Sequence, residues 1–187
     1  ELTEFLPHIK EQLAQVSLLL NNIFEWSKAG INENSVEPEK VNLYKIINVC
    51  IDENELTAKN KNLQIQNSIP TDQMAFADPR MLKVVIRNLL YNSIKYSNDG
   101  DLIVFKGQNN ESQNIFSITD QGIGMSEDQI NKLFSYNTES ELGTAKEIGS
   151  GFGLIICKDF IEMNQGSISV QSKKNTGTTF TIELPKP

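Results

Sequence analysis

Three short motifs occur in a fixed order between residues 87 and 154, and each one demands a particular local backbone. They read RNLLYNSIKY at residues 87–96, DQGIG at residues 120–124 and GSGFGL at residues 149–154. The first has the composition of a helix with one polar face, whereas the other two place glycines where a chain turns sharply. A fold that brings them together would set a polar helix face, a carboxylate beside a turn and a glycine loop around one ligand. Their combined chemistry describes a nucleotide site.

The first motif ends a helix that the sequence predicts over residues 79–96. Its apolar positions step by four and are expected to face a sheet: Leu82, Ile86, Leu90 and Ile94. Asn88, Asn92 and Lys95 share another face, which we expect to be open to ligand. A carboxamide oxygen suits a Mg²⁺ ion that keeps some of its waters and bridges phosphates, and Lys95 would add a positive charge beside them.

The second and third motifs supply a base contact and an anion site. Asp120 ends a strand, and the glycines after it allow a rigid turn that can hold the carboxylate inside a pocket for an exocyclic amino group. The third motif opens a helix, so its amides can solvate phosphate oxygens without net positive charge. A dinucleotide fingerprint is excluded because the glycine spacing differs and Lys173 and Lys174 stand where an acidic residue is required. A Walker loop is excluded because no Gly-Lys-Ser/Thr follows.

In this order the motifs resemble the N, G1 and G2 boxes of the catalytic ATP-binding domain of sensor histidine kinases, which read N-x-x-x-N, D-x-G-x-G and G-x-G-x-G. The resemblance covers residues 36–187 and implies a Bergerat-type ATP-binding fold of the GHKL superfamily, with ATP and Mg²⁺ as cofactors. It implies that Asn92 holds the metal, that Asp120 reads the adenine amine and that Thr178 lies near the same base. The ATP- and phosphate-binding residues that it implies are Asn88, Asn92, Lys95, Tyr96, Asp120, Gly122, Gly124, Phe134, Lys146, Gly149, Gly151, Gly153, Leu154 and Thr178.

Residues 125–150 look like the ATP lid of that family. A polar loop of this length without periodicity is more often functional or disordered than structural. Phe134 matches the phenylalanine of the F box, although the residues around it match imperfectly. Lys146 is the only basic residue deep in this segment, and the arginine that many relatives carry after the phenylalanine is missing.

The remaining pattern predicts an α+β fold, a two-layer α/β sandwich preceded by one long helix. Further helices are expected at residues 42–60, 127–134 and 152–163. Strands are expected at residues 63–69, 102–105, 115–118, 167–171 and 178–184, with a short extended piece at 74–77 and hairpin turns at 108–111 and 175–177.

The first segment follows a pattern of its own. An apolar seam recurs at alternating steps of four and three: Leu2, Leu6, Ile9, Leu13, Val16, Leu20 and Ile23. Residues 30–37 break this period, so we expect two parts, residues 1–35 and residues 36–187. By resemblance, the first part is the second helix of a truncated dimerisation hairpin plus a linker, and the second part is the catalytic domain.

The composition of the chain argues against several classes of binding partner and site. The chain has 187 residues and a net charge of −7, which argues against nucleic-acid or anionic-membrane binding. Cys50 and Cys157 lie in apolar contexts without metal-site spacing, so we expect reduced packing thiols. No apolar run is long enough to cross a membrane, and we expect a cytoplasmic segment, which is compatible with a membrane-anchored sensor.

Two absences shape the expected function. Related ATPases of the superfamily carry a glutamate base four residues before the metal-binding asparagine, and here that position is Asn88, which favours a kinase. His8 is the only histidine and lacks the context of the family's acceptor motif, so the phosphorylated histidine is expected outside these residues.

The resemblance implies a protein histidine kinase core that does not autophosphorylate as an isolated fragment. Its implied partners are its own phosphoacceptor domain, a second copy and a response regulator. Three alternatives stay open: a GHKL-type ATPase, an anti-sigma-type serine kinase and an inactive nucleotide-binding interaction module.

Overall fold

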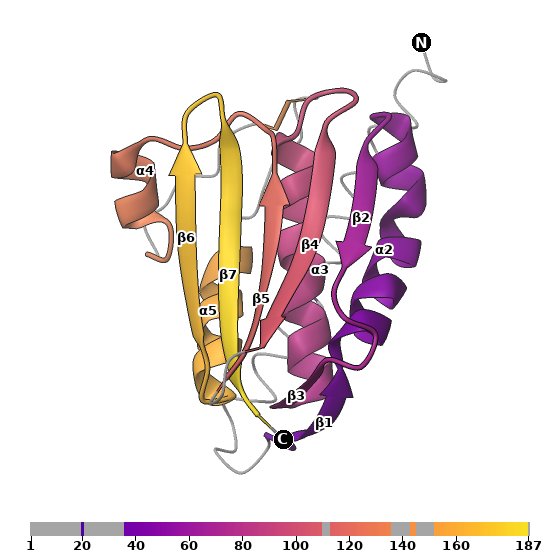
Figure 1. Cartoon of the computed structure of the whole chain (residues 1–187). Helices are drawn as coiled ribbons and strands as arrows, with labels where there is room; N and C mark the ends of the chain where they lie inside the picture. Colours follow the sequence, from indigo (N-terminus) through magenta and orange to yellow (C-terminus); the bar gives the residue numbers. More distant parts are fainter. Residues whose placement is uncertain (1–19, 21–35, 110–112, 136–142, 145–151, 187) are drawn as a thin grey trace.

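The computed structural model describes residues 20, 36–109, 113–135, 143–144 and 152–186, which fold into two layers (Figure 1). The helices are α2 (Leu43–Asn60), α3 (Pro79–Tyr96), α4 (Glu127–Lys132) and α5 (Gly153–Met163). The strands are β1 (Glu39–Asn42), β2 (Gln64–Ser68), β3 (Met74–Ala77), β4 (Leu102–Asn109), β5 (Gln113–Asp120), β6 (Ser167–Lys173) and β7 (Gly177–Pro185). In these ranges no helix combines the length and the apolar character that crossing a bilayer requires. Of the predicted N-terminal seam only Leu20 is described, as a helical residue with an exposed side chain; the rest lies outside the described residues.

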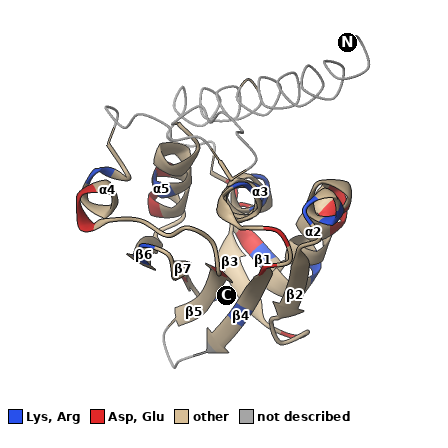
Figure 2. Ribbon diagram, turned by 90° about the horizontal axis from the view of Figure 1, so that it is seen from above, with Lys and Arg blue, Asp and Glu red and all other residues tan. Residues whose placement is uncertain are grey.

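Five strands form one sheet in the order β2-β4-β5-β7-β6. Strands β2 and β4 run parallel, and the other neighbours run antiparallel. Seen from above, α2, α3 and α5 lie side by side over the same face of the sheet, while α4 lies beyond its β6 edge (Figures 1 and 2). This arrangement confirms the expected α+β two-layer sandwich.

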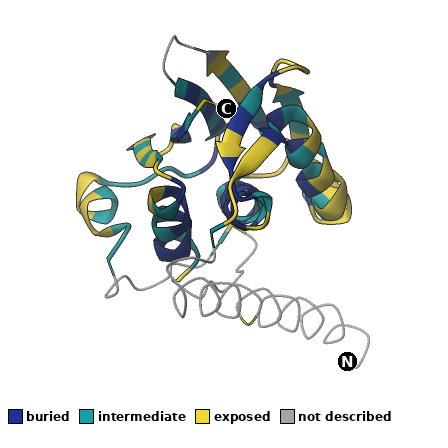
Figure 3. Ribbon diagram, turned by 90° about the horizontal axis from the view of Figure 1, so that it is seen from below, coloured by how far each residue is buried: buried dark blue, intermediate teal, exposed yellow. Residues whose placement is uncertain are grey.

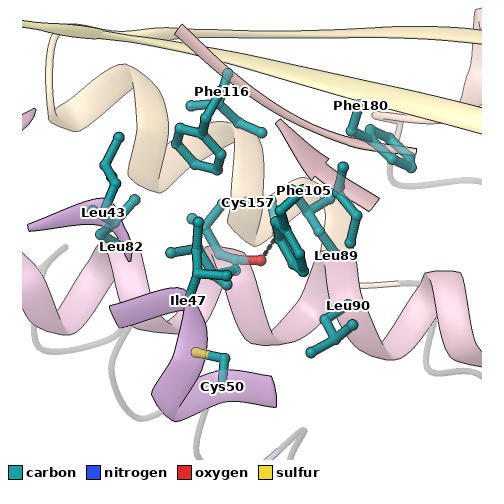
Figure 4. Packing of buried hydrophobic residues seen from close by; sticks show 14 of the residues in the cluster. Leu43, Ile47, Cys50, Leu82, Leu89, Leu90, Phe105, Phe116, Cys157 and Phe180 are labelled. Carbon is teal, nitrogen blue, oxygen red and sulfur yellow. Dashed lines mark hydrogen bonds between the residues drawn. The ribbon is translucent and has the colours of Figure 1, made fainter. Parts of the chain in front are cut away.

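Helix α3 is the central helix of the upper layer, and its start follows from the sequence. The side chain of Asp78 caps it by accepting hydrogen bonds from the backbone amides of Arg80 and Met81, and Pro79 occupies the first turn, where its missing amide hydrogen costs nothing. The four apolar positions expected to face the sheet are all at most 1% exposed: Leu82, Ile86, Leu90 and Ile94. They belong to a core shared with Phe105, Phe116 and Phe180 of the sheet (Figures 3 and 4).

The start of α3 is fastened to the end of α5. Asn164, which follows α5, accepts a hydrogen bond of 2.6 Å from the backbone amide of Asp78. Its own amide group donates to the carbonyl oxygen of Phe160 at 2.7 Å and lies 3.4 Å from the sulfur of Met81. The two helices are therefore joined at the ends that lie far from the second and third motifs.

Strand β1 was not expected from the sequence. It pairs antiparallel with β3, with Val41 opposite Ala75. Its four residues, Glu-Lys-Val-Asn, contain a single apolar side chain and no alternation, so no local pattern marks them as a strand. The strand exists because β3 offers it backbone partners from a distant part of the chain.

Both cysteines are packing residues, as expected. Cys50 and Cys157 are fully buried, and their thiols lie near the carbonyl oxygens of Lys83 and Val85 (Figure 4). Burial raises the pKa of Cys50 to about 11 and raises the pKa of Cys157 further. Neither thiol is poised to react as a thiolate.

Candidate nucleotide-binding site

Asp120 ends β5 with a buried carboxylate whose two oxygens have different surroundings. Oδ1 accepts hydrogen bonds from the backbone amides of Gly122 at 3.0 Å and Thr178 at 3.1 Å. Among the described residues, Oδ2 accepts only a long one of 3.4 Å from the hydroxyl of Ser93. Burial raises the pKa of Asp120 from 3.8 to about 6, although the three hydrogen bonds oppose this. The geometry leaves acceptor capacity on Oδ2, which is what recognition of an amino group requires.

The turn after Asp120 is packed backbone against backbone. A Cβ on Gly122 would overlap the carbonyl oxygen of Tyr96 at the end of α3, and one on Gly124 would overlap that of Lys173. The amide of Ile123 donates to the same Tyr96 oxygen at 3.1 Å. The predicted turn is therefore wedged between α3 and the β6–β7 hairpin, which fixes the direction of the carboxylate.

Gly177 locks the other side of this turn and supplies a stability test. Its φ is +112°, and a Cβ there would overlap the carbonyl oxygen of Asp120. We expect Gly177→Ala to lower the free energy of unfolding by more than about 2 kcal/mol, since strain and overlap add. Gly100→Ala is the matched control: φ is +81°, but nothing lies within 4 Å, so only the strain of about 1 kcal/mol applies. Urea unfolding of both variants measures the difference, and equal losses would show that the close approach to Asp120 costs nothing.

Thr178 lies beside Asp120, and its contact with the base stays a prediction. The two residues are direct partners in the pairing of β5 with β7, and Thr178 is 8% exposed. Its hydroxyl lies 2.9 Å from the hydroxyl of Ser172, which also accepts from the amide of Met125 at 2.9 Å. The base end of the predicted site is therefore a connected group of polar side chains on neighbouring strands and the turn.

The two asparagines of the first motif have different environments. Asn88 is 5% exposed, and its amide donates to the carbonyl oxygen of Val84 at 2.8 Å. Its Oδ1 packs against the start of α5, where a Cβ on Gly153 would approach it to 2.9 Å. Asn92 is half-buried, and its side chain makes no hydrogen bond to the residues that the structure describes. The expectation of an open polar face therefore fits Asn92, whereas Asn88 packs between two helices.

Lys95, like Asn88, is buried, although it was expected on an open polar face. It is 2% exposed, and its ammonium group donates to the hydroxyl of Tyr96 at 2.9 Å and lies 4.6 Å from the centre of that ring. The sequence does not reveal this burial, because a lysine on a polar helix face is normally solvated. Contact of Lys95 and Tyr96 with phosphate stays a prediction.

Part of the third motif and of the predicted lid can be placed. Gly153 is the first residue of α5 and Leu154 is half-buried. Phe134 is half-buried against the core after α4, with the ammonium of Lys158 6.0 Å from its ring. Lys146, Gly149 and Gly151 lie outside the described residues, and so does His8.

Sequence reasoning missed Ser93. Its hydroxyl is buried and contacts the carboxylate of Asp120. Its position directly after Asn92 in the first motif is the one feature of the sequence that could have indicated it. A serine there adds a donor that alanine would lack.

A metal site made only of protein carboxylates is not seen in the described ranges. They contain no group of three or more histidine, cysteine, aspartate or glutamate side chains that could hold a metal ion. A hard cation at Asn92 would thus depend on ligand phosphates and water for most of its coordination, which suits Mg²⁺.

Comparison with known proteins gives consistent results. The family model described as "Histidine kinase-, DNA gyrase B-, and HSP90-like ATPase" matches residues 77–187. The adaptive-response sensory kinase SasA of Prochlorococcus marinus is 30% identical over 95% of this chain and 48% of its own length. The catalytic domain of histidine kinase ThkA has a TM-score of 0.71 at 25% identity, covering 80% of this chain and 96% of that one. ThkA in complex with response regulator protein TrrA matches over 100% of this chain and 52% of that one, with a TM-score of 0.77 at 22% identity. The chain spans less than half the length of the curated relatives that it matches.

Proposed function

This chain belongs to the family of histidine kinase-, DNA gyrase B- and HSP90-like ATPases and carries a catalytic ATP-binding domain of the sensor histidine kinase type, and from this premise we propose that it presents Mg²⁺-ATP for phosphoryl transfer to a histidine side chain. The acceptor is not His8. The nucleotide lies between α3, the turn after β5 and the N-terminal end of α5.

The base binds at Asp120. The free acceptor capacity of Oδ2 receives the 6-amino group, and Thr178 borders the same ring. Gly122 and Gly124 keep the carboxylate in place, because their contacts with Tyr96 and Lys173 leave the turn no room to move. Support for this assignment comes from the burial of Asp120 and the contrast between its two oxygens.

Asn92 holds the metal through its carboxamide oxygen. Its side chain has no hydrogen bond to the described residues, which leaves that oxygen available, whereas Oδ1 of Asn88 packs against Gly153 at the start of α5. Bound Mg²⁺ would neutralise charge on the phosphates. The remaining phosphate contacts are assigned to Lys95, Tyr96, Phe134, Lys146, Gly149, Gly151, Gly153 and Leu154.

The single observation that favours a kinase over an ATP-hydrolysing enzyme is the identity and environment of residue 88. Hydrolysis needs a base that activates water, and a glutamate supplies it in the related ATPases. Here an asparagine occupies that position, and its amide is turned to the carbonyl oxygen of Val84 in a buried contact with α5. A carboxamide cannot take a proton from water as a carboxylate can.

The wider organisation is part of the proposal. Residues 1–35 form the second helix of a dimerisation hairpin and a linker, and residues 36–187 form the catalytic domain. Full-length chains act as a homodimer that phosphorylates its own acceptor domain and passes the phosphoryl group to a response regulator. The complex of ThkA with TrrA supports a partner of this kind.

Labelled ATP tests the proposal. We expect residues 1–187 to bind Mg²⁺-ATP, to release almost no inorganic phosphate and to gain no acid-labile phosphate, with His8→Gln unchanged. The full-length gene product should gain acid-labile phosphate on another histidine. Rapid phosphate release would indicate a GHKL-type ATPase, and phosphoserine on a partner would indicate an anti-sigma-type kinase. Failure to bind ATP with Mg²⁺ would leave an interaction module, and phosphate on His8 would refute the assignment of the acceptor.

A further inference from the structure

Three polar side chains form a row across the neighbouring strands β5, β7 and β6 (Figure 1). Asp120 pairs with Thr178 across β5 and β7, and Thr178 pairs with Ser172 across β7 and β6. The side chains of directly paired residues lie on the same face of a sheet, so all three lie on the face that the helices cover. The row therefore leads from the carboxylate of Asp120 to the edge strand.

The hydroxyl of Ser172 has three hydrogen-bond contacts, and they leave one way to place the hydrogens. The carbonyl oxygen of Gly177, at 2.9 Å, can only accept, so it takes the single hydrogen of Ser172. The backbone amide of Met125, also at 2.9 Å, can only donate. The hydroxyl of Thr178 lies at 2.9 Å as well and must then donate to the oxygen of Ser172. The one hydrogen and both lone pairs of the Ser172 hydroxyl are thus used.

This assignment fixes what the hydroxyl of Thr178 can offer to another partner. Its hydrogen is held by Ser172, so only lone pairs remain available on its oxygen. The side chain of Thr178 has no other hydrogen bond to the residues that the structure describes. Its neighbour across the strands is Asp120, whose Oδ2 is an acceptor too. The base end of the site therefore offers acceptors from two side chains, which match a group that donates.

We propose that Ser172 is a positioning residue for base selectivity: by holding the hydroxyl hydrogen of Thr178, it prevents Thr178 from donating to a purine with a carbonyl group at position 6. The inference rests on the proposed function, because it assumes that the base lies at Asp120 and Thr178. The amino group of adenine carries two hydrogens and suits two acceptors. The carbonyl oxygen of a 6-oxopurine would meet lone pairs only, and buried polar groups would stay unpaired.

The test compares ATP with inosine triphosphate, which has a carbonyl group in place of the 6-amino group. Ser172→Ala frees the hydrogen of Thr178, which can then turn toward that carbonyl oxygen. The ratio of the affinity for ATP to the affinity for inosine triphosphate is expected to fall about fivefold, as one neutral hydrogen bond allows. Ser172→Thr keeps the hydroxyl and should keep the wild-type ratio. Ser169→Ala, at an exposed serine of the same strand, is the matched control.

A double-mutant cycle separates this role from a merely structural one. Thr178→Val has no hydroxyl hydrogen to release, so adding Ser172→Ala to it should leave the ratio of the two affinities unchanged. Two results for Ser172→Ala alone would overturn the inference. One is an unchanged ratio, and the other is an equal loss of affinity for both nucleotides.

Hydrogen exchange gives a readout without nucleotide. By NMR, the hydroxyl proton of Thr178 should exchange slowly with water in the wild type and rapidly in Ser172→Ala. A slow proton in a protein that fails to bind ATP would refute the proposed function and support the hydrogen-bond assignment. Rapid exchange in the wild type would overturn the assignment and, with it, the role of Ser172.

Discussion

Asp120→Asn is expected to weaken ATP binding at least about tenfold at neutral pH and at the same time to stabilise the fold. In the variant, the amide oxygen takes the place of Oδ1 between the backbone amides of Gly122 and Thr178. The amide nitrogen then replaces Oδ2 and meets the amino group of the base as a second donor. Calorimetry with ATP measures the loss of affinity.

The gain in stability follows from the pKa. Because Asp120 has a pKa of about 6 in the fold and 3.8 as the ordinary value, its protonated form is favoured by folding. That contribution is fully present below 3.8 and is lost as the pH rises through about 6. At about 1.4 kcal/mol for each pH unit, the ionised carboxylate costs up to about 3 kcal/mol at neutral pH, and asparagine removes this cost.

Urea unfolding as a function of pH checks the sign. The advantage of Asp120→Asn over the wild type should grow as the pH rises through about 6. Asp72→Asn changes the net charge equally at an exposed position and should show no such growth. Parallel pH curves for wild type and Asp120→Asn would contradict a buried, ionisable Asp120. ATP affinity of the wild type should fall over the same pH interval on acidification, and that of the variant should not.

Asn92→Ala is expected to abolish histidine phosphorylation in the full-length gene product, with a loss of at least about hundredfold, since a group that acts on developing charge in the transition state is removed. The free energy of unfolding should hardly change, because the side chain of Asn92 makes no hydrogen bond to the described residues and alanine favours a helix. Phosphorylation assays and urea unfolding measure the two effects. Chelation of Mg²⁺ should weaken ATP binding to the wild type far more than to the variant.

Asn88→Ala is the natural contrast, four residues earlier on the same helix. It removes a buried hydrogen bond to Val84 and a contact with the start of α5, so it should lower the free energy of unfolding by about 1–3 kcal/mol. If Asn88→Ala lost metal-dependent binding while Asn92→Ala kept it, the assignment of the two asparagines would be reversed.

Local patterns predicted the parts of the fold that local physics determines. Helix α3 has an aspartate cap, a proline in its first turn and apolar residues at steps of four, and it was expected at the observed residues. The turn after Asp120 was expected because Gly122 and Gly124 allow a tight backbone turn that other residues disfavour. Strand β1 was not predicted, because it forms through pairing with β3 and its own composition does not mark it as a strand.

The same distinction applies to the site. The sequence placed Asp120 and Thr178 together through a resemblance, and the pairing of β5 with β7 makes them neighbours. It did not predict the burial of Lys95 or Asn88, because their surroundings come from Tyr96 and from α5. The contacts of Ser172 with Met125 and Thr178 join the turn after β5 to the β6–β7 hairpin, and no periodic pattern marks such a group.

The fastening of α3 to α5 by Asp78 and Asn164 has a mechanical consequence for nucleotide entry. The helices are joined at one end, while their other ends flank the proposed phosphate region. A rotation of α3 relative to α5 would have its pivot at the hydrogen bond between Asp78 and Asn164. At about 1.5 Å per residue, Asn92 lies about 20 Å from this pivot, so a rotation of about 5° moves it by about 2 Å. A small change in packing at Asn164 would thus be amplified into a larger displacement of Asn92 relative to α5.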